Sequence, residues 1–590
     1  MPHQGGGRSL PTAAMTWADL SEEQRSAASY SGRHLLIRGW AGTGKTTALA
    51  ARAAFLLDAG VPPEKILILS PTQAGCNAII DRAQELSGNR NAATLSAWTF
   101  QSWCQNLLDR YPGTFGIEGF SLSGSEEVVQ FVPRGIDSVG MIPFERAIPR
   151  IYARYQMARV PLEDAIYWVY FRKNGFVEGA TKATQFYPEV KRGFEEYIDF
   201  KITNKQYDEI DVQNIIAVTL QNSPEVLQLV SAEMEHILVD EIQDVNALQH
   251  EILSALAPCC DLFCAGDETQ SVRSSQGAEW TSIRRFPVSI PDVEERTLTR
   301  NFRNTKENQD LALWILEQSP LDYRIDIPQA RQAGQMPLLF CSPEKYNLYD
   351  AIAEDIKRNV NQYGYRYEDH LLIARESGDL FGPRISLTKR GIPCPGPETI
   401  RRKRWQGAHI RQLLTPLVRF ADTDADPATL FSEIRKRFEE SQDPQSYIFG
   451  ERYQNEYDEL QDLAGQAQDI KHFFQLVEEN RTVTKQTGYK QDHCIRIETI
   501  QDAKAVEAEI CYLWDISHLH WPRRDERNVP DLMEERRRLL SLGITRARSK
   551  VVILCADHTA YLKKNKKIPF FLQEIGPMVE LIDTFDEISL

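Results

Sequence analysis

A glycine-rich run directly after a short apolar segment constrains this chain more than any other feature. Residues 34–37 read His-Leu-Leu-Ile, which predicts a buried strand, and residues 39–46 read G-x-x-x-x-G-K-T. Glycines let the backbone turn tightly enough for its N–H groups to face a phosphate. The alanine- and leucine-rich residues 48–57 predict a helix whose N-terminus points at that anion. The order predicts an α/β nucleotide-binding core, in which Lys45 reaches the β- and γ-phosphates and Thr46 holds Mg²⁺.

A second apolar run ends in two acids. Residues 236–239 predict another strand, and Asp240 and Glu241 follow it directly. A carboxylate pair at the end of a strand suits a metal ion and the activation of water, with Asp240 in the shell of the metal and Glu241 polarising the attacking water. Without the phosphate loop, two solvated acids at an exposed strand end would be the better interpretation.

The composition sets broad limits on the class of protein. The chain has 590 residues, of which 42 % are hydrophobic and 26 % charged, as in ordinary soluble globular proteins. At roughly 150 residues a domain, this length suggests about four structural units. No apolar run approaches the ~20 residues that span a bilayer, so we expect no membrane attachment. Residues 1–14, with three successive glycines and no apolar signal core, are expected to form a flexible leader.

The cysteines and the net charge narrow the class further. Ten cysteines are scattered without a C-x-x-C pair, which excludes zinc-ribbon and clustered iron–sulfur patterns and indicates reduced thiols in a cytoplasmic protein. The formal net charge of −15 weighs against a protein that coats nucleic acid by bulk attraction. The charge does not exclude a local basic groove between acidic outer faces.

Taken in order along the chain, these motifs and several others resemble the UvrD/Rep group of superfamily 1 helicases. Residues 20–24 look like the family's adenine-reading Q motif, and residues 542–548, L-G-I-T-R-A-R, match its motif VI almost letter for letter. The other segments that carry the resemblance are 39–46, 99–103, 239–244, 266–271, 298–305, 498–507 and 569–575.

The resemblance implies an α/β fold with two RecA-like P-loop NTPase cores, each a parallel sheet flanked by helices and each interrupted by a mainly helical insertion. It implies that ATP lies between the cores and that Arg303 and Arg546 reach the γ-phosphate from the second core. Phe302 would stack on adenine, Glu507 would lie near the ribose, and Gln270 would sense the γ-phosphate.

Together, the loop pattern and the resemblance give three sets of predicted site residues. The catalytic residues are Lys45, Glu241, Gln270, Arg303 and Arg546. The metal ligands are Thr46 and Asp240. The ATP-binding residues are Gln24, Gly39, Trp40, Ala41, Gly42, Thr43, Gly44, Lys45, Thr46, Thr47, Phe302, Arg303, Glu507 and Arg546.

The motif positions also set the expected domains. The first core (1A) takes residues 15–112 and 205–290, with the helical insertion 1B at 113–204. The second core (2A) takes residues 291–395 and 490–590, with a 2B insertion at 396–489 that is smaller than the family usually has.

The departures from the family pattern cluster on the DNA side. After Gln270 and Ser271 the family usually continues I-Y-x-W-R-G-A, but here Arg273 and Ser275 replace the two aromatic residues expected to stack on bases. Such stacking contributes roughly 1–3 kcal/mol per base. The remaining candidates for DNA contact are Thr72, Thr99, Phe100, Trp103 and Arg273, and the aromatic rings among them could equally belong to the core.

The sequence therefore favours an ATP-dependent DNA helicase or translocase, moving 3′ to 5′ on single-stranded DNA in repair, recombination or defence. It would use ATP and Mg²⁺ and bind single-stranded or tailed duplex DNA. One alternative is a DNA-stimulated ATPase that does not unwind and instead remodels or regulates a partner such as a nuclease or another repair or defence protein. Another is a nucleotide-binding scaffold without catalysis, against which Glu241 and the two arginines argue.

Overall fold

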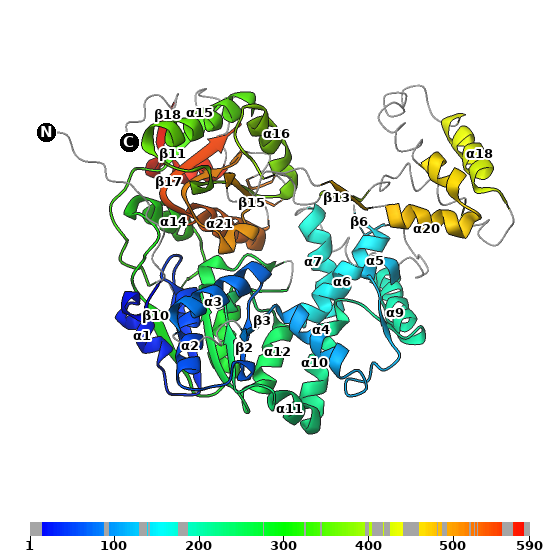
Figure 1. Ribbon diagram of the computed structural model, residues 1–590, viewed down its shortest axis with the longest axis horizontal. Helices are drawn as coiled ribbons and strands as arrows, with labels where there is room; N and C mark the ends of the chain where they lie inside the picture. The colour runs from blue at the N-terminus through cyan, green and yellow to red at the C-terminus, as the bar shows by residue number, and fades with distance from the viewer. Residues whose placement is uncertain are drawn as a thin grey trace. The chain divides into compact units, whose positions relative to one another are not determined.

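The computed structural model places most of the chain (Figure 1). It describes residues 15–87, 94–128, 138–139, 142–174, 187–274, 277–323, 326–342, 345–395, 400–403, 417, 425–440, 460–480, 482–485, 493–517, 521–523, 526–527, 529–556 and 570–582. The predicted leader, residues 1–14, lies outside the described residues. The chain divides into two compact units, one of Met1–Ile392 with Ile495–Leu590 and the other of Pro393–Cys494.

The larger unit contains a first parallel sheet of six strands. Its spatial order is β10 (Val293–Leu298), β1 (His34–Gly39), β9 (Asp261–Gly266), β8 (His236–Val239), β2 (Ile66–Leu69) and β3 (Ser96–Trp98). The carboxyl ends of parallel strands share one edge of a sheet, so the segments that follow β1, β9, β8 and β2 meet there. Ligands of open α/β sheets bind at such an edge.

Helices cover both faces of this sheet because successive strand residues point to opposite sides. Leu35 and Ile37 of β1 pack with the helices after β1 and β2, whereas Leu36 packs on the other face. Buried apolar residues on both faces explain why the parallel strands read as continuous apolar runs. The helices are α1 (Glu22–Ala28), α2 (Lys45–Asp58), α3 (Gln73–Leu86), α4 (Phe100–Arg110), α10 (Asp211–Asn222), α11 (Pro224–Ser231), α12 (Ala247–Leu256) and α13 (Ser282–Ser289).

A second parallel sheet of six strands belongs to the same unit. Its spatial order is β15 (Arg496–Thr499), β12 (His370–Ala374), β16 (Ala508–Leu513), β17 (Ala547–Cys555), β11 (Leu338–Cys341) and β18 (Glu580–Ile582). The accompanying helices are α14 (Lys306–Glu317), α15 (Lys345–Tyr363), α16 (Phe381–Lys389), α21 (Pro530–Ile544) and α23 (Phe570–Ile575). The predicted fold class, α/β with two parallel sheets flanked by helices, is confirmed.

The segment between α4 and α10 is mainly helical and has a core of its own, in which Phe144, Tyr152, Phe194 and Tyr197 are buried. It contains β4 (Ser121–Leu122), α5 (Ser125–Val128), β5 (Ser138–Val139), β6 (Ile142–Pro143), α6 (Phe144–Ala158), α7 (Leu162–Asn174), α9 (Tyr187–Thr203) and β7 (Gln206–Tyr207). Its predicted bounds of 113–204 stay a prediction.

The smaller unit has a minor core around Leu417, Phe431, Leu460 and Phe473. Its described elements are β13 (Ile400–Lys403), paired antiparallel with β14 (Thr482–Lys485), and the helices α18 (Pro427–Glu440) and α20 (Ile470–Asn480). Across the described residues of both units, no helix has the length and apolar character needed to cross a membrane.

Candidate active site

The phosphate loop connects β1 to α2 and is shaped by two glycines with positive φ. Gly42 has φ 79° and Gly44 has φ 83°, a backbone conformation that favours glycine. Space is also restricted, because a Cβ on Gly44 would lie 2.2 Å from Gln24 Nε2 and one on Gly42 would lie 2.3 Å from Asn301 Oδ1. The loop is therefore fixed by both its conformation and its close neighbours.

Lys45, the first residue of α2, is buried at the mouth of this loop. Its Nζ donates to the carbonyl oxygens of Gly39 at 2.7 Å and Trp40 at 3.2 Å. Burial lowers the pKa of Lys45, and the nearby carboxylate of Asp267, whose Oδ2 lies 3.9 Å from Nζ, opposes that shift. The side chain thus presents a desolvated ammonium where an anionic group would meet the loop.

Gln24 approaches the same loop from α1. Its Oε1 accepts from the backbone N–H of Ser21 at 2.9 Å, in a capping box that fixes the start of the helix. Its Nε2 donates to the carbonyl oxygens of Thr43 and Gly44, both at 3.4 Å. The predicted adenine-reading residue is therefore held against the phosphate loop.

Two acids follow β8 at the shared edge of the sheet. The Thr46 hydroxyl donates to Asp240 Oδ2 at 3.3 Å, and Glu241 adopts the left-handed conformation with φ 53°. Burial, together with the charge of Glu241, raises the pKa of Asp240. Burial also disfavours the ionised form of Glu241, but the charges of Lys504 and Lys45 outweigh this effect and lower its pKa. The site therefore contains one buried carboxylate with little compensating positive charge and one that is well compensated.

Thr46 and Asp240 supply oxygen atoms of the type that Mg²⁺ takes in proteins. Within the part of the chain that the structure describes, no group of three or more His, Cys, Asp or Glu side chains could hold a metal ion.

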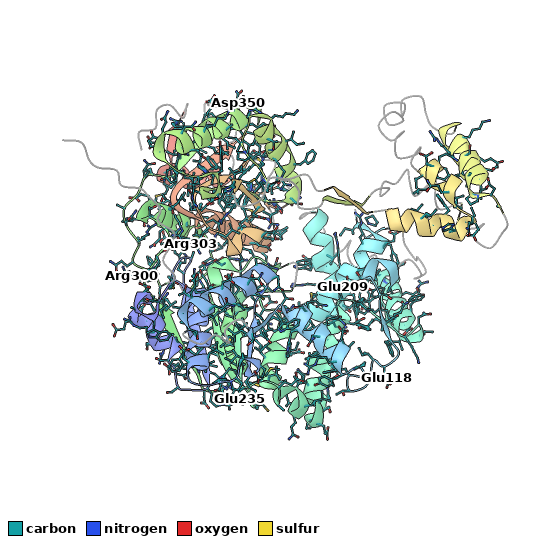
Figure 2. All side chains as sticks on the ribbon, viewed as in Figure 1. Glu118, Glu209, Glu235, Arg300, Arg303 and Asp350 are labelled. Atoms are coloured by element: carbon teal, nitrogen blue, oxygen red, sulfur yellow. The ribbon has the colours of Figure 1, made fainter. Side chains whose placement is uncertain are left out.

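Two arginines reach the same place from different segments. Arg303, labelled in Figure 2, lies between β10 and α14, and Arg546 lies between α21 and β17 of the second sheet. Arg303 Nε donates to Glu507, which also accepts from Arg548. Burial would raise the pKa of Glu507, but the charges of Arg303 and Arg548 lower it to about 2. Arg546 is buried, and its Nη2 donates to Gln270 Oε1 at 3.4 Å. Burial and the charge of Arg303 lower the pKa of Arg546.

These side chains line one cavity of roughly 300 Å³, which we call the nucleotide cavity. The residues that line it come from segments beside both sheets. They are Met15, Asp19, Gln24, Ala41, Gly42, Gly44, Lys45, Thr46, Thr47, Arg82, Glu241, Gln270, Phe302, Arg303, Lys504, Glu507, Arg546 and Arg548. Phe302 is partly exposed, and its backbone N–H donates to the carbonyl oxygen of Gly42 at 2.9 Å.

Three predicted ATP-binding residues support the loop instead of lining the cavity. Trp40 and Thr43 are buried, and the Thr43 hydroxyl donates to the carbonyl oxygen of Trp40 at 2.8 Å. Gly39 ends β1 and accepts from Lys45. All the other predicted catalytic and ATP-binding residues line the nucleotide cavity, and Asp240 lies beside it through its bond to Thr46.

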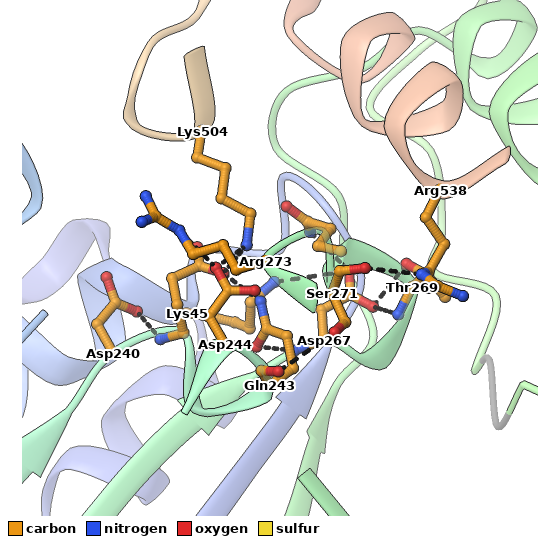
Figure 3. A network of polar contacts seen from close by, with 12 residues as sticks. Lys45, Asp240, Gln243, Asp244, Asp267, Thr269, Ser271, Arg273, Lys504 and Arg538 are labelled. Atoms are coloured by element: carbon orange, nitrogen blue, oxygen red, sulfur yellow. Dashed lines mark hydrogen bonds and ion pairs between the residues drawn. The ribbon is translucent and has the colours of Figure 1, made fainter. Parts of the chain in front are cut away.

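Lys504 is a site residue that is absent from the predicted set. It lies in the 3₁₀ turn Asp502–Ala505 before β16, and its Nζ lies 2.6 Å from Asp244 Oδ2 and 3.4 Å from Glu241 Oε2. Arg273 Nε lies 3.3 Å from the same Asp244 oxygen, so the buried carboxylate is shared between two cations (Figure 3). The signal was present, because Asp244 and Lys504 both lie inside segments that carried the family resemblance.

The residues predicted to contact DNA do not line the nucleotide cavity. Phe100 and Trp103 are 6 % and 4 % exposed and lie in the hydrophobic core against the first sheet. They follow the core alternative because they lie one turn apart on the inner face of α4. Thr72 and Thr99 cap α3 and α4, accepting from the backbone N–H groups three residues ahead at 3.1 Å.

This chain is similar in sequence to known proteins of one family. Residues 20–291 match the UvrD/REP helicase N-terminal domain. The chain is 25 % identical to YjcD of Bacillus subtilis over 362 residues, covering 60 % of this chain and 46 % of that protein. It is 25 % identical to the ATP-dependent DNA helicase PcrA of Staphylococcus aureus, covering 63 % of this chain and 50 % of that protein. It is 24 % identical to the ATP-dependent DNA helicase UvrD1 of Mycobacterium bovis, with coverages of 63 % and 49 %. The chain thus spans about half the length of these relatives.

Proposed function

We propose that this chain, which belongs to the UvrD/Rep family of superfamily 1 helicases, is an ATP-hydrolysing motor that moves on DNA. One observation carries the proposal. A phosphate loop, an acid pair and two arginines line or adjoin one cavity. Arg303 comes from the segment between β10 and α14, whereas Arg546 comes from the turn before β17 of the other sheet. Hydrolysis of a phosphoanhydride needs such positioned charge more than it needs covalent chemistry.

In the proposed reaction, the phosphates of ATP lie on the loop and against Lys45. The oxygen of a water molecule forms a bond to the γ-phosphorus, and the bond from that phosphorus to the β–γ bridging oxygen breaks, so ADP leaves with the electron pair. Glu241 orients the water and takes its proton, which leaves inorganic phosphate. Arg303 and Arg546 balance the negative charge on the transferred group, as paired guanidinium donors can in a fixed geometry.

Mg²⁺ would be held by the Thr46 hydroxyl and the Asp240 carboxylate, the pair that is already in contact. When bound, the ion would neutralise charge on the β- and γ-phosphates. The raised pKa of Asp240 fits this role, because a carboxylate that lacks positive charge gains most from a cation.

Coupling to movement would run through the segment after Gln270. The second core holds the backbone of that segment, since Arg538 Nε donates to the carbonyl oxygen of Ser271 at 2.7 Å and Gln501 Nε2 to that of Val272 at 3.1 Å. A change at the γ-phosphate that moves Gln270 against Arg546 would therefore reach contacts between the cores. Opening and closing of the cores in each cycle would move the DNA.

We further propose that the track is single-stranded DNA, that movement runs 3′ to 5′, and that turnover opens duplexes in repair, recombination or defence. The test is strand separation on three fluorescent duplexes, with a 3′ tail, with a 5′ tail and with blunt ends. We expect ATP-dependent opening of the 3′-tailed duplex. Opening of the 5′-tailed duplex alone would contradict the polarity.

A second candidate is a DNA-stimulated ATPase that does not unwind and instead remodels or regulates a partner such as a nuclease. Burial of Phe100 and Trp103 and the pairing of Arg273 favour it, because these side chains are then not positioned to stack on bases. In the same assay this candidate predicts that single-stranded DNA accelerates phosphate release while all three duplexes stay closed.

A further inference from the structure

A second cavity lies beside the nucleotide cavity, on the side of the acid pair. It has a volume of roughly 180 Å³, and we call it the side cavity. Six residues line both cavities, which are Thr46, Arg82, Glu241, Arg303, Lys504 and Glu507. Gly42, Gly44 and Lys45 line the nucleotide cavity and not the side cavity, whereas Asp240 lines the side cavity. The two spaces therefore meet at the residues that would carry out hydrolysis.

One wall of the side cavity is formed by α3 and its N-cap residue. Thr72, Gly75, Ala78 and Arg82 line it along successive turns of the helix. Because α3 follows β2, these residues lie at the same edge of the sheet as Asp240 and the phosphate loop. Ala78 is exposed to solvent, so this side of the cavity opens outward and not into the protein core.

The charges on the walls suit a small anion. Four basic side chains, Arg82, Arg273, Arg303 and Lys504, line the side cavity against the three carboxylates of Asp240, Glu241 and Glu507. Arg273 and Lys504 are held in place by Asp244, at 3.3 Å and 2.6 Å, and Asp244 lies behind them and does not line the cavity. Their anchoring carboxylate is therefore not part of the cavity wall.

The geometry of phosphoryl transfer indicates the direction in which the phosphate product moves. The attacking and leaving oxygens lie roughly in line on opposite sides of the transferred phosphorus. With ADP on the loop and Glu241 beside the attacking water, the phosphate that forms is displaced away from ADP and toward Glu241. Glu241 lines both cavities, whereas the loop glycines Gly42 and Gly44 line only the nucleotide cavity, so a phosphate that moves from the loop toward Glu241 approaches the side cavity.

We propose that the side cavity is the exit route of inorganic phosphate, which leaves past α3 while ADP still occupies the nucleotide cavity. This inference rests on the proposed ATP hydrolysis. It assigns Arg82, Arg273 and Lys504 as transient phosphate contacts along the route, and it assigns Ala78 to the rim.

The test narrows the rim without touching the catalytic residues. Ala78→Phe places a ring at the mouth, and Ala74→Phe is the matched control, because Ala74 is exposed one turn earlier on α3 and does not line the cavity. In single turnovers, chemical quench measures hydrolysis on the enzyme and a fluorescent phosphate sensor measures release into solution. We expect Ala78→Phe to slow phosphate release about tenfold or more, which corresponds to roughly 1.4 kcal/mol, and to leave hydrolysis and ADP release unchanged. Ala74→Phe should change none of the three rates.

A pair of charge variants at the same position keeps the proposal falsifiable should Ala78→Phe disturb the helix. A phosphate dianion should leave more slowly past the carboxylate of Ala78→Glu and faster past the ammonium of Ala78→Lys, and added salt should shrink both effects. Equal release rates in the two variants, or a slower rate in Ala78→Lys, would overturn the proposal.

The two levels of inference fail in different ways. If the wild-type protein shows no hydrolysis in the quench experiment, the proposed function fails. If hydrolysis proceeds and phosphate release is the same in wild type, Ala78→Phe and Ala78→Glu, the exit route is wrong and the ATPase proposal stands.

Discussion

The nucleotide side of this molecule and its expected DNA side differ in whether their predicted residues come together at one site, although they are built from neighbouring segments. On the nucleotide side, residues from α1, the phosphate loop, the end of β8 and the second core line one cavity. On the DNA side, Phe100 and Trp103 are core residues, and Arg273 is occupied by Asp244. Both sides were inferred from motifs of the same family, and only the first set of residues comes together at one place.

The difference follows from what each side demands of the chain. A phosphate must meet backbone N–H groups and fixed charges at set positions, so glycines with positive φ, a buried lysine and an acid pair recur together. Base stacking needs only an exposed ring, and any ring can instead be buried in the core. A motif therefore specifies the nucleotide site more tightly than the DNA track.

The largest expected effect is a loss of ATP turnover at Arg546, and it tests the nucleotide side of the comparison. Arg546→Ala removes a guanidinium that touches Gln270 across the two cores. Loss of such an arginine costs roughly 10³–10⁵-fold in turnover, so we expect kcat for ATP to fall by that order with a much smaller change in KM. Steady-state phosphate release measures both.

Arg546→Lys is the control for this variant, because lysine keeps the charge but loses the planar fork of donors. We expect it to recover only part of the activity. Wild-type turnover in Arg546→Ala, with the fold verified by circular dichroism, would show that the second core does not take part in hydrolysis.

The next effect concerns Trp103 and tests the DNA side. Because the ring is buried against the first sheet, Trp103→Ala should lower the free energy of unfolding by about 3–5 kcal/mol. Affinity for single-stranded DNA, measured by fluorescence anisotropy at a temperature where the variant stays folded, should change little. Trp103→Phe should restore most of the stability. A variant of normal stability that has lost DNA binding would show that the Trp103 ring contacts DNA.

The smallest effect is expected at Arg273. Arg273→Ala leaves Asp244 paired with Lys504 at 2.6 Å, so the buried carboxylate keeps one cation. We expect affinity for single-stranded DNA to change by about twofold or less, because Arg273 is held by Asp244 and is not positioned to stack on bases. A tenfold loss would show that Arg273 contacts DNA and that the two sides of the molecule are equally well specified by their motifs.

Particular residues show which parts of the fold and the site can be predicted from the sequence. The phosphate loop and the Asp240–Glu241 pair were predictable because each follows a buried parallel strand, and the sheet brings the strand ends to one edge. Lys504 lies in a segment that carries the family resemblance, but its pairing with Asp244 depends on how the second core folds against the first, which the motif alone does not specify. The burial of Phe100 and Trp103 likewise depends on which face of α4 meets the sheet.

The central claim is ATP hydrolysis driven by these residues and tied to DNA. The most direct measurement is phosphate release by the wild-type chain and by Glu241→Gln, each with and without single-stranded DNA. We predict turnover that single-stranded DNA accelerates, and a loss of roughly 10²–10⁴-fold in Glu241→Gln with the fold unchanged. Absence of turnover under both conditions, or equal turnover in the two proteins, would contradict the account.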